Sequence, residues 1–271
     1  MQALGLVWVG TRTTEFEATR RFFETTLGLP VGNERTHFVR FDLPDAGAVE
    51  VFDARVDPYT HFTTGPVVGI QVSDFDAARI ELASNGYALL GGVGGQSGEY
   101  RWQHFRGPDG SVLEIVDYPG RPSPGPPAGR LQITRIAFMG IATSMFEETV
   151  RFYKDLLGAK PVGEEANVIE CRLPDGSAVE AFRRGTEMDH PHLRTGPLPG
   201  FGVSDYQAAI GVLRECGVPV LQTREGKWGG WAHFRAPDGC VYEITDRLKV
   251  PKPPGFIDRS RPNRNRRRIA E

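Results

Sequence analysis

The chain has 271 residues, of which 39% are hydrophobic and 24% are charged, and its formal net charge is −2. This composition is typical of a globular protein, and the length allows two domains of ordinary size. Neither an apolar run of about 18 residues nor an export signal at the N-terminus "MQALGLVWVG" is found, so the sequence predicts no membrane association.

The first part of the chain predicts the order β-α-β-β-β. Residues 6–13 alternate like a strand, and residues 15–28 have helical spacing with one apolar side, which comprises Phe16, Phe22, Phe23 and Leu27. Gly28 follows that helix, and two short strands at 37–43 and 48–54 are joined by a Pro-Asp turn. The order then recurs, with a strand at 67–73, a helix at 74–86, a glycine-rich loop at 91–98 and a hairpin at 99–117.

The second part of the chain repeats the first. The hairpin "WQHFRGPDGSVLEIVD" (102–117) returns as "WAHFRAPDGCVYEITD" (231–246), and "HFTTGPVVGIQVSDFDAA" (61–78) returns as "HLRTGPLPGFGVSDYQAA" (192–209). We therefore expect two homologous domains of two modules each. Their predicted bounds are 1–118 (modules 1–60 and 65–118) and 131–248 (modules 131–190 and 196–248), with a stiff Pro-rich linker at 119–130.

Two further features concern the environment of the protein. The cysteines Cys171, Cys216 and Cys240 are odd in number, which favours reduced thiols and a cytoplasmic location. The tail 249–271 is basic, and such a run either contacts nucleic acid or an anionic surface or is a solvated, flexible terminus. The second interpretation is favoured, and because no aromatic platform accompanies the charges we do not expect nucleic-acid binding.

Several of these motifs together resemble one family. A helix ending in "RFYKDLLG" (151–158), "VSDxxAA" at two helix starts and "PDGxxxE" in two hairpins are similar to the vicinal oxygen chelate superfamily, over nearly the whole chain except the linker and tail. That family includes glyoxalase I, extradiol dioxygenases, fosfomycin-modifying enzymes and bleomycin-binding proteins. The resemblance implies an α+β fold of four βαβββ modules, forming two tandem glyoxalase-like domains with cupped sheets. It is compatible with a monomer whose domains pair within the chain, or with a homodimer.

The resemblance also implies where metal ligands would lie. The family places Glu on the final strand of each module, which corresponds here to Glu50, Glu114, Glu180 and Glu243. It places His on each first strand, but those positions hold Trp8, Val67, Phe138 and Leu198, none of which can donate to a divalent ion. We therefore expect no metal and no other cofactor. His192 as a shifted ligand, or a metal held by Glu50, His104 and Glu114, remains an alternative.

Each repeated hairpin offers other chemistry. Trp102 and His104 share one face of their strand, and the resemblance places them, like Trp231 and His233, inside a cup beside Glu114 and Glu243 respectively. We expect the first domain's cup to combine Arg40, Glu50, His104 and Glu114 with Trp8 and Trp102. The second domain's cup then holds Phe138, Glu170, Glu180, Trp231, His233 and Glu243.

Two functions from different classes compete. The first is a metal-independent enzyme of isomerase, cyclase or lyase type, acting on a small planar or carbonyl-bearing metabolite. In it His104 moves a proton, Glu114 orients it and Arg40 holds a developing oxyanion. Ligand contacts are expected from seven further residues: Trp8, Glu50, Trp102, Phe138, Trp231, His233 and Glu243.

The alternative is a non-catalytic protein of the bleomycin-binding type that binds an antibiotic or metabolite, and a second alternative is a metal-dependent glyoxalase or dioxygenase. Each His–Glu pair is also compatible with a purely structural role. The sequence favours the enzyme slightly, because both halves contain a His and a Glu at matched positions.

Overall fold

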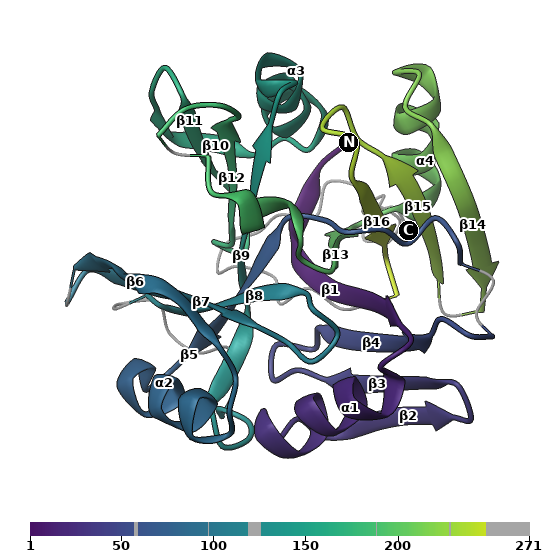
Figure 1. Cartoon of the computed structure of the whole chain (residues 1–271). Coiled ribbons are helices and arrows are strands. Elements are labelled where there is room, and N and C mark those ends of the chain that lie inside the picture. The colour runs from purple at the N-terminus through teal and green to yellow at the C-terminus, as the bar shows by residue number, and fades with distance from the viewer. Residues whose placement is uncertain (57–58, 97, 119–125, 188, 228, 248–271) are drawn as a thin grey trace, which may run out of the picture.

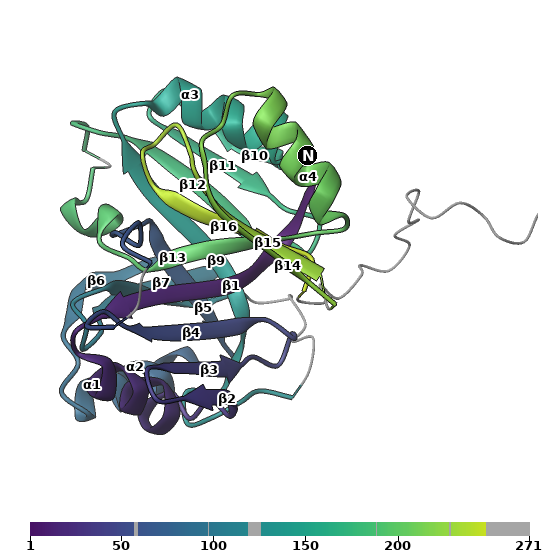
Figure 2. The ribbon, with the colours of Figure 1, turned by 90° about the vertical axis from the view of Figure 1, so that its right-hand side faces the viewer.

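Two curved eight-stranded sheets with helices packed against them form the protein (Figures 1 and 2). The structure, a computed structural model, describes all residues except 57–58, 97, 119–125, 188, 228 and 248–271. Most of the expected linker and the whole expected basic tail therefore lie outside the described residues. The four βαβββ modules and the cupped sheets expected from the sequence are confirmed.

The elements follow one another in the same order four times. The first two modules contain β1 (Ala3–Thr13), α1 (Phe16–Arg21), β2 (Val31–Arg35), β3 (Phe38–Asp42), β4 (Ala48–Asp53), β5 (Val67–Val72), α2 (Phe75–Ser84), β6 (Leu89–Gln96), β7 (Tyr100–Arg106) and β8 (Val112–Asp117). The last two contain β9 (Ile133–Thr143), α3 (Phe146–Arg151), β10 (Lys160–Glu164), β11 (Val168–Arg172), β12 (Ala178–Arg183), β13 (Leu198–Val203), α4 (Tyr206–Glu215), β14 (Val220–Gly226), β15 (Gly229–Arg235) and β16 (Val241–Thr245). A short 3₁₀ helix, Pro191–Arg194, precedes β13.

The helices form where the sequence predicts them. α1 continues into a π-helical turn, Phe22–Thr26, whose apolar side is buried, and Gly28 ends it at φ +72°. The aspartates of the two "VSDxxAA" motifs cap α2 and α4, since the Asp74 and Asp205 carboxylates each accept a backbone N–H three residues later at 3.0 Å. Among the described residues, no helix has the length and apolarity that a membrane span requires.

One expected loop is a strand. Residues 91–98 were predicted to form a loop because of their glycines, but β6 extends to Gln96 and pairs with β7. The reason is local packing: the Trp102 indole lies across β6, and a Cβ at Gly94 would overlap its ring. Glycine is required there for the close approach of a side chain, so its presence does not mark a loop.

The strand order corrects the expected grouping of modules. One sheet has the order β14-β15-β16-β13-β1-β4-β3-β2 and the other β10-β11-β12-β9-β5-β8-β7-β6. Antiparallel pairing of β1 with β13 and of β5 with β9 joins the first module to the fourth and the second to the third. Each cup is therefore built from both halves of the chain. Because all four modules repeat one apolar pattern, that pattern could not identify which first strands pair.

Modules of the same half are instead joined through their helices and the strands behind them. α1 lies beside α2 on one side of the sheets, and α3 beside α4 on the other (Figures 1 and 2). The Phe22 ring, after α1, contacts Tyr87 at 4.8 Å between centroids, and Phe152, after α3, lies 6.0 Å from Phe234. Packing between helices and strands thus joins the two modules within each half. Strand pairing within each sheet joins a module of one half to a module of the other.

Candidate functional site

Each sheet curves around one hollow. Cup A lies in the sheet of β1–β4 and β13–β16, has a volume of about 370 Å³, and its lining includes Trp8, Arg40, Glu50, Trp231, His233 and Glu243. Cup B lies in the sheet of β5–β12, has a volume of about 220 Å³, and its lining includes Trp102, His104, Glu114, Phe138, Glu170 and Glu180.

The predicted site residues therefore line cups, but not in the predicted combinations. Arg40, Glu50 and Trp8 were expected beside His104 and Glu114, and this grouping is wrong because the two sets lie in different sheets. Phe138, Glu170 and Glu180 were expected with the His233 hairpin and instead lie with the His104 hairpin. The set of Arg, Glu, His and Trp expected for one cup does occur together, in cup A, where His233, Glu243 and Trp231 supply the hairpin residues.

In both cups the hairpin places an imidazole against a carboxylate. His104 and Glu114 are directly opposite each other on β7 and β8, and Nε2 lies 2.9 Å from Oε2. His233 and Glu243 occupy the same positions on β15 and β16, with the corresponding atoms 3.2 Å apart. Both pairs are buried. The contact of His104 does not have the geometry of a hydrogen bond, so it is a close polar contact between groups that strand register holds opposite each other.

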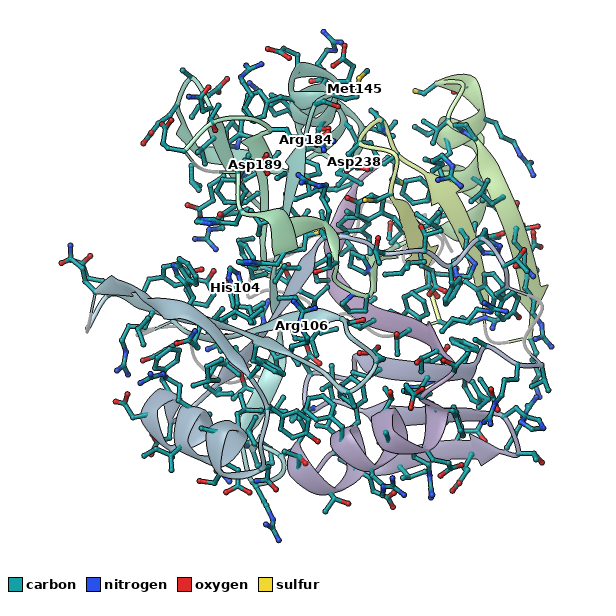
Figure 3. All side chains as sticks on the ribbon, viewed as in Figure 1. His104, Arg106, Met145, Arg184, Asp189 and Asp238 are labelled. Carbon is teal, nitrogen blue, oxygen red and sulfur yellow. The ribbon has the colours of Figure 1, made fainter. Side chains whose placement is uncertain are left out.

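A second histidine contacts each buried one. Nε2 of His61 lies 2.8 Å from Nδ1 of His233, and Nε2 of His192 lies 2.8 Å from Nδ1 of His104. Figure 3 labels His104 on β7, and His192 reaches it from the short helix before β13. Sequence reasoning did not assign His61 a role and considered His192 only as a metal ligand. Their matched places at the start of "HFTTGP" and "HLRTGP" were the available signal.

Burial shifts the proton equilibria of these groups. It raises the pKa of Glu114 and of Glu243 well above the usual carboxyl value. It lowers the pKa of His104 to about 4, and also lowers that of His61 and of His192 to about 4, with the neighbouring histidine adding to both. Since both members of the His104–Glu114 pair favour the uncharged form, the pair holds one proton near neutral pH.

Each cup has a further carboxyl group facing the pair. Burial, followed by repulsion from Glu243, raises the pKa of Glu50 to about 7, although a hydrogen bond from Trp8 opposes the shift. Burial, followed by the charges of Glu170 and Glu114, raises the pKa of Glu180 to about 8. A carboxyl group with a pKa near 7 can both accept and donate a proton at neutral pH, which makes Glu50 a candidate general base.

Aromatic rings fill the floor of both cups, where the family would place a metal. The Trp8 indole covers Gly10 on its own strand and lies against Gly200 of β13, whose added Cβ would come within 3.0 Å of the Trp8 Cβ. Phe138 lies in the same way between Gly69 and Gly140. These four glycines are the strand neighbours of the four final-strand glutamates.

A metal ion of the family type does not fit these residues. The first-strand positions supply no side chain with a lone pair for a metal ion, and the Trp8 and Phe138 rings lie against the glycines beside the glutamates. Among the described residues, no group of three His, Cys, Asp or Glu side chains is placed to hold a metal ion.

Comparison with known proteins addresses the family and the fold. The sequence model of the Glyoxalase/Bleomycin resistance protein/Dioxygenase superfamily matches residues 5–115 and 133–244. The search of curated protein sequences found no significant relative.

Solved structures with a similar fold include a putative dioxygenase from Bacillus subtilis, with 14% identity, a TM-score of 0.68 and coverage of 90% of this chain and 85% of that one. Glyoxalase I from Zea mays has 17% identity and a TM-score of 0.63, covering 91% and 92% respectively. Identities this low show a shared fold and leave the reaction open. Because the family model matches both repeats, the chain belongs to the glyoxalase/bleomycin resistance protein/dioxygenase superfamily.

Proposed function

We propose that this protein is a metal-independent enzyme of isomerase, cyclase or lyase type. Its substrate is a small planar or carbonyl-bearing molecule bound in cup A. The observation that carries the proposal is the set of proton-holding groups in that cup: Glu50 on one side, and the contact chain Glu243–His233–His61 on the other. Cup B contains the matching contacts of Glu114, His104 and His192, but the described residues that line it include no arginine.

The roles follow from position and protonation. Glu50, with a pKa of about 7, accepts a proton from the carbon next to a carbonyl group. Arg40, which lies opposite Glu50 on β3, holds the oxyanion that develops. The Glu243–His233 pair returns a proton at a second atom, and the half-buried His61 exchanges protons between His233 and solvent. The net result is movement of a proton on one substrate.

Independence from metal is supported by the floor of the cup. Trp8 and the glycines beside it take the place that a metal and its histidines would need. The indole also gives a planar ligand a surface on which to stack, as does Trp231 at the side.

Deuterium exchange tests the reaction without knowledge of the natural substrate. A panel of carbonyl compounds headed by phenylpyruvate is incubated with the protein in D₂O, and loss of the proton next to the carbonyl is followed by NMR. We expect exchange faster than in buffer, and a decrease of about 100-fold in Glu50→Gln, which removes the group that accepts the proton. Glu180→Gln, the matched change in cup B, is the control and should exchange like the wild type.

The same experiment separates the alternatives. A panel compound that binds and is recovered without exchange would indicate a binding protein of the bleomycin-binding type. Dialysis against a chelator, with metal content measured, should leave the exchange rate unchanged. A rate that falls on chelation and recovers with Mn²⁺ or Zn²⁺ would instead place the protein among the metal-dependent enzymes.

A further inference from the structure

The two cups share their central chemistry and differ in the charges around it. Each has a tryptophan, a histidine and a glutamate on its hairpin, and a second glutamate facing them. Because the modules are repeats of one another, each position in cup A has an equivalent in cup B, which can be identified from strand register. The two cups can therefore be compared position by position within one protein.

The clearest difference is an ion pair in which the basic and the acidic residue have exchanged positions along the strand. On β3, Arg40 lines cup A, and its Nε donates to the Asp42 carboxylate at 2.9 Å. On β11, the equivalent positions hold Glu170, which lines cup B, and Arg172, which pairs with it. The two strands occupy the same place in their sheets, since Arg40 lies opposite Glu50 and Glu170 lies opposite Glu180.

Three other arginines line cup A, and each is replaced in cup B. Arg35, opposite Phe38, corresponds to Glu165, whose N–H donates to the carbonyl of Val168 at 2.8 Å. Arg224 lies opposite Trp231, and the residue opposite Trp102 is Gly94.

The last of the three is Arg247. It lies two residues after Thr245, which is opposite Trp231 in the hairpin. The equivalent residue after Val116, the partner of Trp102, is Tyr118. All four positions thus change from arginine to an acidic or uncharged residue.

We propose that cup A binds an organic anion with a planar apolar body, and that cup B excludes such a ligand. Guanidinium groups on β2, β3 and β14 and after β16 surround an aromatic floor in cup A, so an anionic group at the mouth can be bound while the body stacks on Trp8. In cup B the place of Arg40 is taken by the carboxylate of Glu170, which repels an anion. This inference deepens the proposed function, since it gives the substrate class of the same cup.

Three nearly isosteric probes test the charge preference. Benzoate is anionic, benzamide is neutral and benzamidine is cationic, and all three are planar. Each is titrated into the full-length protein, and the indole N–H signals of Trp231 in cup A and Trp102 in cup B report which cup is occupied. We expect benzoate to move the Trp231 signal with an affinity at least about tenfold higher than benzamidine, weakening as salt is added.

A double substitution isolates the sign of the charge. Arg40→Glu with Asp42→Arg gives cup A the ion pair of cup B, and should reduce benzoate affinity by about tenfold while the pair itself is kept. The matched control, Glu170→Arg with Arg172→Asp, should leave the Trp231 response unchanged. If the double variant does not fold, Arg224→Gly on the exposed edge strand β14 should weaken benzoate binding in the same direction.

The outcomes are distinct. Equal affinity for the three probes, no response of Trp231 to benzoate, a preference unchanged by the pair reversal, or a benzoate response at Trp102 would each overturn the proposal. None of these measurements requires turnover. The charge preference can therefore hold even if Glu50→Gln leaves deuterium exchange unchanged. Conversely, exchange can depend on Glu50 even if the three probes bind equally well.

Discussion

Glu50→Gln should change how the stability of the protein depends on pH. The carboxyl has a folded-state pKa of about 7 against an ordinary value of 4.5, so between these values the folded protein holds a proton that the unfolded chain has released. The free energy of unfolding contributed by Glu50 therefore falls as pH rises through this window, and levels off above it. Each tenfold change in the acid dissociation constant corresponds to about 1.4 kcal/mol, so the free energy of unfolding falls by about 3 kcal/mol across the window. The decrease is nearer about 2 kcal/mol because the Glu50 side chain is partly exposed and screened by solvent.

Glutamine cannot ionise, and its side-chain oxygen still accepts the hydrogen bond from Trp8. The variant should match the wild type at pH 4.5 and become more stable than it by about 2–3 kcal/mol at pH 8. Urea unfolding at several pH values between these limits measures the difference. Glu99→Gln, on an exposed turn, controls for the loss of one carboxylate from the net charge. Parallel curves for Glu50→Gln and the wild type across this range would refute the assigned burial and protonation of the cup A floor.

Four other predictions concern strand packing, helix propensity, helix capping and protonation. Gly200→Ala should destabilise the protein by about 1–3 kcal/mol in urea unfolding, because its Cβ would lie 3.0 Å from Trp8 and 3.1 Å from Glu243. Gly211→Ala, inside α4 where a Cβ meets nothing within 4 Å, should instead stabilise it by about 0.5–1 kcal/mol. Asp205→Ala removes the cap of α4 and should cost about 1 kcal/mol, seen as a lower Tm, and an undiminished Tm would contradict the capping role. Since burial lowers the pKa of His104 to about 4, its imidazole should stay neutral in ¹H–¹⁵N NMR spectra as the pH falls from 7 to 5, and a titration near 6.5 would show that it is exposed.

The sequence predicted the parts of the site better than their assembly. The family resemblance placed His104 beside Glu114 and His233 beside Glu243, and both pairs lie opposite each other in their hairpins. Such neighbours are close in the sequence, so one short motif contains both members of a pair. The partner of β1 is nearly 200 residues away, at β13, and four similar first strands offered several equivalent partners. The grouping of Arg40 with His104 failed for that reason. His61 was missed because its partner His233 is joined to it only through that long-range pairing.

The reversed ion pair explains how one fold can present opposite charges in two equivalent cups. Residues two apart on a strand share a face, so Arg40 and Asp42 on β3 neutralise each other without help from another element, as Glu170 and Arg172 do on β11. Exchanging the two members leaves the charge of the strand and the pair itself unchanged, but it reverses the sign of the residue that lines the cup. Ligand preference in this architecture can therefore change at little cost to stability. The shared fold thus gives both cups one shape, whereas the order of two side chains on β3 and β11 sets the sign of one charge that lines each cup.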